Sequence, residues 1–538
     1  MTTDARKPQL SDLAVVVDPD HDDVAVAVQP IDAGTTLYGE NGNPVTLRAT
    51  IRAGHRFAIR PVPAGTWILQ YGQPFAISRG LVPGDPVNDS TADSEVPEIG
   101  PDAVDLHPTA LPAWDGPPPT FDGFRRTDGN VGIRNWVLVV PTSMWAAHEA
   151  TQIATRAEAN GIYSRAAYPN VDGVTAIAHN GGCACPDPTV QTVGPGAYES
   201  TLRMLGQHIR HPNVGAAIVI ELGCEKTNHV AFDEYFGTSD LETLYGKPVR
   251  RLSVQNLGGT QATIERGLAL LPELLADANR TSRRPAPLSS LALGLECGGS
   301  DAFSGLTANP ALGHASDLLV RAGGRSVIGE VPEFFGAAHL FAARAADRAV
   351  VSQIYAMLEA YRAYAARAGH SMTENPSRGN KEGGLLNITI KSLGAQAKSG
   401  SATVQGVMQY SEWVWDRDRS GVYLLNTPGY DQLSVPALVG SGCQLVCFTT
   451  GRGTGIGNAI APVIKIASNT PLYRRMQADM DIDAGTAIPA HGGTPVSLPE
   501  LGQRIFDSIL DVASGRMTRA EDNGHREFAL WDIEGLWL

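Results

Sequence analysis

After about residue 120, apolar strand-like runs alternate with helical stretches, and this pattern constrains the fold more than any other feature. The run "WVLVVPTS" precedes "AAHEATQIATRAEANG", and "VTAIAHNGGC" and "AAIVIELGCE" follow. A second cycle contains "LALGLECGGS", "RSVIGEVPE", "GVYLLNTPG" and "LVCFTTGRG". Such alternation is typical of α/β domains with largely parallel sheets. A division near Ser282 to Ser289 predicts two of them, at 120–285 and 286–538.

The chain before residue 120 has a different pattern. Short β-type runs separated by Gly and Pro turns extend from about Leu13 to Val87, which predicts a small all-β module at 1–88. Residues 89–119 are rich in Pro, Asp and Ser without sustained periodicity, so we expect a linker there. Several domains are expected in 538 residues, because single cores stop growing near ~250–300 residues.

Charge and composition restrict the class of protein. Hydrophobic residues make up 43% and charged residues 18%, which is globular composition. The net charge of −14 provides no basic field for nucleic acid, so nucleic acid is excluded as a partner. The amino terminus lacks the blocks of a signal peptide, and no run of ~18 apolar residues predicts a membrane span. Six cysteines are too few for a disulfide scaffold, and we expect a cytoplasmic protein.

Nearly every expected strand ends in a polar or small residue. Parallel sheets bind ligands outside the carboxyl ends of their strands, where loops converge. In "LECGGSDAFSGLTANPALG", two glycines follow Cys297, and four small polar side chains crowd the next ten positions. The glycines would admit a ligand, and the side chains would offer it hydrogen bonds. The four are Ser300, Asp301, Ser304 and Asn309.

Two loops carry groups suited to a metal. "AHNGGCACPD" contains His179 and Cys183, and "IELGCEKTNH" contains Cys224 and Glu225. Imidazole, thiolate and carboxylate groups together suit a divalent transition metal, and an incomplete protein shell leaves positions for substrate. The spacing matches no structural zinc site, and a single cysteine is more often a small buried hydrophobe. Convergence of the two loops is therefore the condition for a metal site.

Several cations lie near expected strand ends. Arg125, Arg134 and Asn135 occur in "FDGFRRTDGNVGIRN", and arginine grips carboxylates through two hydrogen bonds. Arginines before a strand also form salt bridges between domains, which is the commoner case. Lys381 in "NPSRGNKEGG" is suited to pair with a carboxylate or move a proton, although loop lysines are usually solvated. Arg452 lies in the glycine-rich "CFTTGRGTGIGNAIAP", which lacks the P-loop ending and fits a nucleotide site poorly.

Together these strings resemble the altronate and galactarate dehydratase family, whose relatives include sulfolactate sulfo-lyase. The resemblance covers most of the chain in one order: "HDDVAVAV", "AGHRFA" and "QYGQPFAI" in a SAF-type β module, then "FDGFRRTDGNVGIRN", "LGCEKTN", "CGGSDAFSGLTANPALG", "GNKEGG", "TPGYD" and "FTTGRGTGIGNAIAPVIK". It implies a multidomain hydro-lyase that removes water from a sugar acid to give a 2-keto-3-deoxy acid. It also implies a divalent metal, with iron(II) preferred over Mn(II) or Mg(II).

The resemblance also implies roles for residues. His21 and His55, which the residues alone would class as structural histidines, become expected catalytic groups, and His179 and Lys381 compete as the general base. The metal is expected near Cys183, Cys224, Glu225 and Cys297. Contacts with the substrate are expected from Arg125, Arg134, Asn135, Ser300, Asp301, Ser304, Asn309 and Arg452.

Departures from the family pattern keep alternatives open. Met144 and Trp145 stand where relatives carry an Asn-Cys pair, and Ala395 replaces a cysteine. A sulfo-lyase or other β-elimination on a smaller hydroxy acid is one alternative, and a non-catalytic sugar-acid binder is another. An iron–sulfur cluster on the cysteines is the less favoured cofactor. The expected partner is a small sugar acid, with a homodimer as one possible assembly.

Overall fold

The computed structural model describes residues 7–39, 42–185, 196–489 and 494–531. Its first part is all-β, as predicted. An antiparallel sheet has the order β1-β2-β5-β8, a hairpin joins β3 and β4, and a third sheet has the order β6-β7-β9. The strands are β1 (Ala14–Val15), β2 (Val24–Ala27), β3 (Thr36–Tyr38), β4 (Pro44–Thr46), β5 (Arg56–Ala58), β6 (Trp67–Gln70), β7 (Gln73–Ser78), β8 (Pro86–Val87) and β9 (Ala92–Asp93), after a short α1 (Leu10–Leu13).

One turn of this module places a side chain at the junction with the second α/β domain. Tyr71 and Gly72 connect β6 to β7, and both have positive φ angles, of 58° and 66°. Positive φ at both central residues defines the type I′ turn that matches the twist of a hairpin. The turn directs Tyr71 toward the second α/β domain, where it lines a small cavity with Ser300 and Asp301.

The segment between the module and the α/β domains contains one short helix, η1 (Pro101–Ala103), among residues 94–119. This segment packs along the surface of the second α/β domain. Tyr355 donates from its hydroxyl to the Ile99 carbonyl at 2.7 Å, and Arg321 donates to the Pro112 carbonyl at 3.0 Å. These bonds hold the connection in a defined path.

The first α/β domain has a parallel sheet of order β13-β12-β14-β15. Alternation along β12 explains its two faces, because successive side chains of a strand point to opposite sides. Val137 and Val139 pack with α2 and α7, whereas Leu138 and Val140 belong to a core shared with α3 and the second domain. The elements are β12 (Trp136–Pro141), β13 (Gly173–Ala176), β14 (Val214–Glu221), β15 (Val249–Ser253), η2 (Met144–Ala146), α2 (Ala147–Ala159), α3 (Ala197–Arg210), α4 (His229–Phe236), α5 (Leu241–Tyr245), α6 (Val254–Leu257) and α7 (Thr260–Asn279).

A small antiparallel sheet joins the two α/β domains. Its order is β11-β10-β16, so that the strand entering the first domain pairs with the strand entering the second. The strands are β10 (Thr120–Arg125), β11 (Val131–Gly132) and β16 (Arg284–Pro287).

The second α/β domain has a parallel sheet of seven strands in the order β19-β20-β18-β17-β21-β22-β23. The sequence order therefore changes direction at β17, between β18 on one side and β21 on the other. Ligands in such sheets bind outside the carboxyl ends of the strands at this switch point. The strands are β17 (Ala292–Cys297), β18 (Arg325–Ile328), β19 (Val404–Met408), β20 (Gly421–Leu425), β21 (Leu445–Thr450), β22 (Val463–Ala467) and β23 (Ile482–Asp483). The largely parallel sheets of both domains confirm the predicted fold class.

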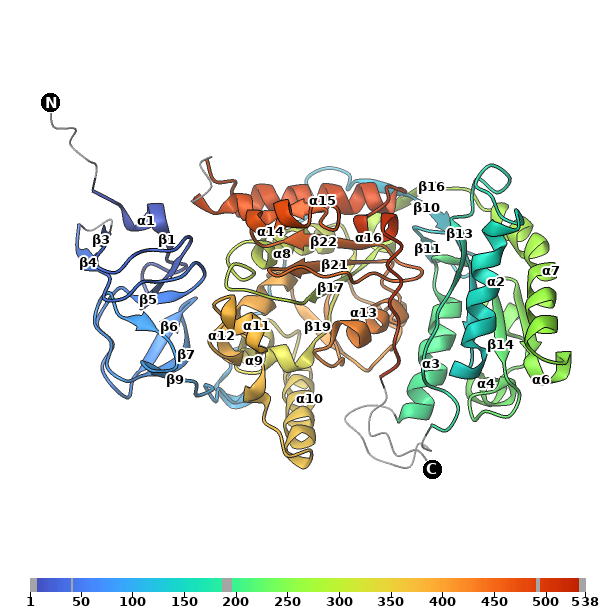
Figure 1. Ribbon diagram of the computed structural model, residues 1–538, viewed down its shortest axis with the longest axis horizontal. Coiled ribbons are helices and arrows are strands. Elements are labelled where there is room, and N and C mark those ends of the chain that lie inside the picture. Colours follow the sequence, from blue (N-terminus) through green and yellow to red (C-terminus); the bar gives the residue numbers. More distant parts are fainter. Residues whose placement is uncertain (1–6, 40–41, 186–195, 490–493, 532–538) are drawn as a thin grey trace.

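Helices cover this sheet on both faces, with α8 and α15 packed together along one of them (Figure 1). The helices are η3 (Leu288–Ser290), α8 (Ala308–Arg321), η4 (Val331–Phe334), α9 (Ala338–Ala343), α10 (Arg348–Arg367), η5 (Met372–Glu374), α11 (Arg378–Glu382), α12 (Ile388–Gln396), η6 (Ala397–Ser399), η7 (Val414–Asp416), α13 (Asp431–Gly440), α14 (Thr470–Arg475), η8 (Ala484–Ala487), α15 (Leu498–Ala513) and α16 (Arg519–Asp522). Within the ranges described, no helix is long and apolar enough to cross a membrane.

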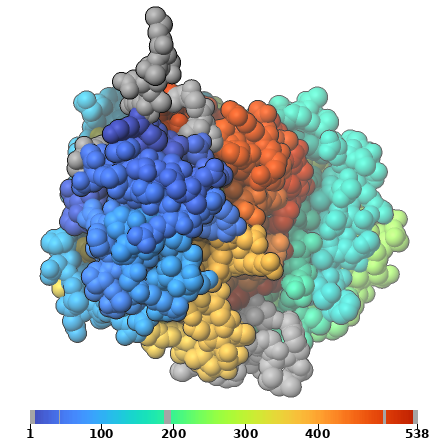
Figure 2. Space-filling view, turned by 60° about the vertical axis from the view of Figure 1, so that its left-hand side comes forward, coloured from blue at the N-terminus to red at the C-terminus, as the bar shows by residue number. Residues whose placement is uncertain are grey.

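The second α/β domain lies between the other two parts, with the β module at one end of the molecule and the first α/β domain at the other (Figure 1). The module packs against α9, α12 and the segment between α11 and α12, and Figure 2 shows the blue module in contact with an orange part of the second α/β domain. Asn387 donates to the Phe75 carbonyl at 2.7 Å, and His339 bonds to Gln73 at 2.8 Å. The junction is thus both apolar and hydrogen-bonded.

Candidate active site

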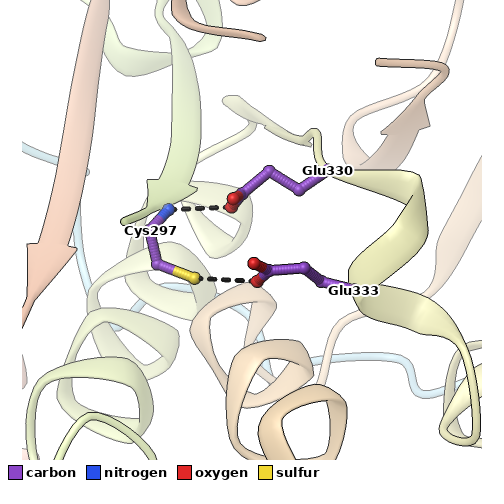
Figure 3. A group of neighbouring side chains, drawn as sticks. All are labelled: Cys297, Glu330 and Glu333. Atoms are coloured by element: carbon purple, nitrogen blue, oxygen red, sulfur yellow. Dashed lines mark hydrogen bonds between the residues drawn. The ribbon is translucent and has the colours of Figure 1, made fainter. Parts of the chain in front are cut away.

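A buried group of ionisable side chains lies where β17 and β18 end. The backbone N–H of Cys297 donates to Glu330 at 2.8 Å, and the Cys297 thiol donates to Glu333 at 3.1 Å (Figure 3). Glu330 has a φ of 66°, in the left-handed region that non-glycine residues rarely adopt. This conformation turns the chain from β18 into η4 and brings both carboxylates to the end of β17.

Two lysines complete the group. Lys398 of η6 donates to Glu330 at 2.7 Å and to the Cys297 sulfur at 2.9 Å, and Lys391 of α12 forms an ion pair with Glu333. Burial raises the pKa of Glu330 to about 7, with the neighbouring Glu333 charge adding to the effect. Burial, with both carboxylates nearby, also holds the pKa of the Cys297 thiol well above its usual value. The protonated thiol is therefore the form that donates to Glu333.

Two more carboxyl groups face this cluster. Glu296, Glu330 and Asp431 bring carboxylate oxygens within 4.8 Å of one another, and Ser434 donates to Glu296 at 2.8 Å. Burial raises the pKa of Glu296 well above its usual value and that of Asp431 to about 6. Four carboxyls and one thiol thus share two ammonium groups, and of these seven groups only Asp431 and Lys391 are not fully buried.

This donor set fits a divalent transition metal. The sulfur of Cys297 and one oxygen each of Glu330 and Glu333 also lie within 4.8 Å of one another. Thiolate and carboxylate ligands suit such ions, and the excess of acidic groups gives a cation a favourable charge environment. Metal binding would release the thiol proton, since the thiolate is the ligand.

The loop after β17 leads from this cluster to the β module. A Cβ on Gly298 would lie 2.2 Å from a carboxylate oxygen of Asp431, and Gly299 has a φ of +56°, so both positions require glycine. Asp301 then accepts four hydrogen bonds, from the N–H and hydroxyl of Ser304, from Ser468 at 2.8 Å and from Asn469 at 2.9 Å. Desolvation nevertheless raises the pKa of Asp301.

The same loop holds α11 in place. Asn380 donates to the Ser300 carbonyl at 2.7 Å, and the Ala302 N–H donates to the Gly383 carbonyl at 3.0 Å. Asn309 bonds to the Gly394 carbonyl and accepts from Thr449, whereas the buried Ser300 hydroxyl has no partner in the part of the chain described. The small polar residues therefore act mainly as anchors, and Ser300 and Asp301 remain at the junction.

Two cavities lie between the β module and the second α/β domain, and Glu382 lines both. One, of about 360 Å³, is lined by charged groups including Arg52, His55, Arg378 and Lys381. The other, of about 240 Å³, is lined by polar groups including Asp301, Arg452, Asn469 and Arg475. Arg452 lies 3.8 Å from the Glu382 carboxylate. Cations therefore outnumber anions here, although the whole chain is acidic.

His55 has a defined tautomer in the first cavity. Its Nε2 lies 3.4 Å from the Glu382 carbonyl, which only accepts, so Nε2 carries the proton and Nδ1 keeps a lone pair. Burial and the nearby Arg52 and Arg56 charges lower the pKa of the ring. The ring is therefore neutral near pH 7 and able to accept a proton.

Comparison with known proteins agrees with this architecture along the chain. Family models match residues 13–87 (altronate/galactarate dehydratase SAF domain), 123–279 (D-galactarate dehydratase/altronate hydrolase, second domain) and 288–535 (D-galactarate/altronate dehydratase, C-terminal). Altronate dehydratase of Escherichia coli is 35% identical over 95% of this chain and 97% of its own.

The chain belongs to the D-galactarate/altronate dehydratase family. Galactarate dehydratase (L-threo-forming) of Escherichia coli is 34% identical over 95% of both chains. The (2R)-sulfolactate sulfo-lyase subunit beta of Chromohalobacter salexigens is 33% identical, over 76% of this chain and 97% of its own. The predicted family is confirmed, and with it the assignment as a hydro-lyase.

Within this family member, the structure places three predicted substrate contacts elsewhere. Arg134 is fully buried in an ion pair with Glu521, at 2.7 Å, and donates to carbonyls of α15 and the turn after it. Asn135 bonds to the Asn170 and Ala278 carbonyls before β12, at the opposite end of that strand from its carboxyl end. Arg125 donates to the Pro285 carbonyl of β16 at 3.1 Å. Arg134 and Arg125 thus tie the two α/β domains together, whereas Asn135 holds parts of the first domain to one another.

The predicted metal loops also lie apart from the module histidines. The Lys226 N–H donates to the Cys183 carbonyl, so the loops carrying Cys183 and Cys224 do meet, but in the first α/β domain. Glu225 accepts from Thr142 at 2.7 Å and from two backbone N–H groups of its own loop. Of the predicted metal residues, only Cys297 joins a group of three candidate ligands among the residues described.

Two predicted catalytic histidines are accounted for by other contacts. Both ring nitrogens of His179 are bonded, Nε2 to the Pro141 carbonyl at 2.8 Å and Nδ1 to the Gly181 N–H, and burial lowers its pKa to about 4. His21 is exposed and bonds to Asp18 at 2.9 Å, outside the two junction cavities. His55 and Lys381 alone among the four predicted catalytic residues line a junction cavity.

Sequence reasoning missed most of the charged cluster. Glu333, Lys391 and Lys398 come from η4, α12 and η6, and each looks like an ordinary helical residue. A signal did exist for Glu296 and Glu330, since both acids lie at or just after the end of a buried apolar strand. Trp145, one of the departures from the family pattern, is exposed on the first α/β domain and lines neither junction cavity.

Proposed function

We propose that this protein dehydrates a sugar acid, an aldonate or an aldarate, to a 2-keto-3-deoxy acid at the junction of the β module and the second α/β domain. The cationic lining of the junction cavities carries this proposal. A volume of about 360 Å³ is within the usual range for small-molecule sites, and sites occur preferentially at domain interfaces. The dehydratase relatives, which align over 95% of the chain, support the same chemistry.

The substrate carboxylate would bind to the cations of the cavities. Arg452 lies beside the loop after β17, at the switch point of the sheet, and its guanidinium suits a two-bonded grip on a carboxylate. Removal of the proton from C2 builds negative charge on the carboxylate oxygens, so that a cation held there stabilises the transition state more than the ground state.

His55 is the proposed general base. Its Nδ1 holds the free lone pair, and its lowered pKa keeps that lone pair available near neutral pH. The electrons of the C2–H bond form the C2–C3 double bond as the C3–O bond breaks. The ammonium group of Lys381, in the same cavity, would give a proton to the departing hydroxyl, which leaves as water. The resulting enol then becomes the 2-keto acid.

We propose Cys297, Glu330 and Glu333 as the residues that hold a divalent metal, with iron(II) the first ion to test. When bound, such an ion supplies a Lewis acid that withdraws electron density from oxygen ligands. The protein's own contribution is to keep the cluster largely buried and to balance it with Lys391 and Lys398. Gly298 and Gly299 connect this cluster directly to the junction loop.

The test is anaerobic turnover of the purified protein after iron(II) reconstitution, with altronate, galactarate and sulfolactate as substrates. We expect a 2-keto-3-deoxy acid from a hexonate or an aldarate. Sulfite release from sulfolactate, without dehydration of either sugar acid, would identify a sulfo-lyase instead. Binding of a sugar acid without turnover of any substrate would show a binding protein and refute the proposal.

A further inference from the structure

A short stretch of backbone in the second α/β domain, at residues 382–384, contacts both the β module and the loop after β17. Its three successive carbonyl groups lie against three different donors. They are Nε2 of His55 on Glu382, at 3.4 Å, the N–H of Ala302 on Gly383, at 3.0 Å, and the guanidinium of Arg56 on Gly384. One stretch of backbone therefore connects the module to the loop that leads to Cys297.

Glycine allows the two backbones to touch. A Cβ on Gly384 would lie 2.2 Å from the Gly54 carbonyl oxygen, and a Cβ on Gly54 would lie 2.9 Å from the Gly383 carbonyl oxygen. Gly384 and Gly54 also have positive φ angles, of 96° and 78°, which glycine adopts without strain. The module therefore meets this stretch backbone to backbone at Gly54, the residue directly before His55.

Arg56 is a buried cation without a charged partner. It is 2% exposed, and its hydrogen bonds go to the Gln70 side-chain oxygen and the Gly384 carbonyl, so it has no ion pair within the part of the chain described. Burial lowers the pKa of Arg56 to about 10, because a buried charge loses its hydration. A neutral side chain would avoid that cost. We therefore expect the arginine to do something at this position that a neutral residue could not do.

The shape of the guanidinium group accounts for an arginine at this position. The group is planar and presents its N–H donors in a fixed fork, so it can hold two acceptors in one geometry. One acceptor, Gln70, lies in β6 of the module, and the other, Gly384, lies in the second α/β domain. Since Arg56 begins β5, an inner strand of the four-stranded sheet of the module, the fork connects a rigid element of the module to the stretch at 382–384.

The backbone of His55 is fixed to the same sheet. Its N–H donates to the Arg52 carbonyl at 3.0 Å, and its carbonyl accepts from the Ala27 N–H of β2 at 3.0 Å. A shift of the module relative to the second α/β domain would therefore move the His55 ring together with Arg56. The bond from Arg56 to Gly384 is consequently suited to fix the position of the ring relative to Lys381 of α11, which lines the same cavity.

We propose that Arg56 is a positioning residue for the reaction, which holds the His55 ring in place against the second α/β domain through the Gly384 carbonyl. This inference rests on the proposed function, in which His55 is the general base. Arg56 acts only through the place that it gives to His55. Small displacements matter in such a site, since a shift of ~1 Å can lower a rate about 100-fold.

Arg56 contributes both a charge and a position, and two variants distinguish them. The charges of Arg52 and Arg56 both lower the pKa of the His55 ring. Arg56→Met removes the hydrogen bonds and the charge, so the pKa of the ring should rise. Arg56→Lys keeps the charge but cannot hold both acceptors in one geometry. The other charged residues that line the cavity around His55 stay unchanged in both variants, and they are Arg52, Asp89, Arg378, Lys381 and Glu382.

The test is steady-state turnover of the full-length, iron(II)-reconstituted protein with whichever of galactarate and altronate it dehydrates. Arg56→Lys and Arg56→Met are each measured alone and combined with His55→Gln. Arg60→Lys is the matched control, because Arg60 also donates to carbonyls, those of Pro19 and Asp20 in the module, but lines neither junction cavity. A melting temperature for each variant verifies that the fold is retained, and Arg56→Lys alone decides the test if Arg56→Met does not fold.

We expect both Arg56 variants to lower kcat about 10- to 100-fold with little change in KM, and Arg60→Lys to change neither. The acid limb of the pH profile of kcat should stay in place in Arg56→Lys and move to higher pH in Arg56→Met. Neither variant should lower kcat further in the His55→Gln background, because a residue that acts through His55 has no effect once His55 is absent. Equal losses of kcat in both backgrounds, or an unchanged kcat when His55 is present, would overturn this inference alone. No turnover by the unsubstituted protein, or no effect of His55→Gln, would overturn the proposed function and this inference with it.

Discussion

Replacement of Lys398 by methionine should destabilise the second α/β domain more than any surface change. Its ammonium lies 2.7 Å from Glu330 and 2.9 Å from the Cys297 sulfur, and its side chain is 1% exposed. Removing one partner of a buried pair leaves the other charge uncompensated, at a cost of about 3–5 kcal/mol. This is a large part of the ~5–15 kcal/mol that stabilises a typical domain.

The size of the effect has an upper limit. Without Lys398, Glu330 would take up a proton in the folded state, and because its pKa there is already about 7, this uptake at pH 8 limits the added cost at Glu330 to about 1.4 kcal/mol at ~1.36 kcal/mol per pKa unit. The rest of the expected loss comes from the hydrogen bonds that Lys398 makes to Glu330 and to the Cys297 sulfur. The measurement is the free energy of unfolding in urea at pH 8 with EDTA present, so that no metal supports the cluster. Trp413 and Trp415, which lie in this domain, contribute to the intrinsic fluorescence of the eight tryptophans that would follow unfolding.

Two further variants make the test specific. Lys465→Met removes another fully buried lysine, which has a histidine and a carbonyl as hydrogen-bond partners, and it should cost clearly less. The double variant Lys398→Met with Glu330→Gln removes both charges and should recover at least about half of the loss. A loss below about 1 kcal/mol for Lys398→Met, or no recovery in the double variant, would refute the assignment of a tightly balanced ionic cluster.

Three other predictions follow from the positions of single residues. His55→Gln should lower kcat at least about 100-fold with little change in KM. It should also abolish the acid limb of the pH profile of kcat, which we expect below pH 6.5 because the pKa of the His55 ring is lowered. The control His370→Gln, at an exposed histidine, should change neither, and equal pH profiles for the two variants would argue against His55 as the base. Arg134→Met should lower the free energy of unfolding by about 3–5 kcal/mol, measured as a lower melting temperature, and leave KM of the folded enzyme unchanged. A raised KM at unchanged stability would show instead that Arg134 binds the substrate. Cys297→Ser should reduce bound iron(II), measured by elemental analysis, while Cys224→Ser retains it, and the reverse result would move the metal to the first α/β domain.

The order of the domains followed from periodicity alone. Short β runs, a proline-rich segment and two cycles of strand and helix are local patterns, and local patterns survive into the fold because each strand and helix buries its own apolar face. The glycines after Cys297 were also informative, since their close approach and positive φ are properties of the local backbone.

Pairings over long sequence distances were not predictable in this way. Lys398 meets Cys297 from about 100 positions away, and nothing in "AKSGS" distinguishes this lysine from a solvated one. Arg134 before a strand has the same local sequence whether it binds a substrate or, as here, Glu521 near the end of the chain. The choice between those roles depends on which domains pack together, which single-sequence patterns do not contain.

The position of the substrate is the central claim, and a crystal structure of the iron-free protein with galactarate tests it most directly. We predict electron density for the dicarboxylate between the β module and the second α/β domain, within hydrogen-bonding distance of His55 or Lys381 and with a carboxylate on Arg452. Density beside Cys183 and Cys224 in the first α/β domain, with the junction cavities holding only water, would contradict the account.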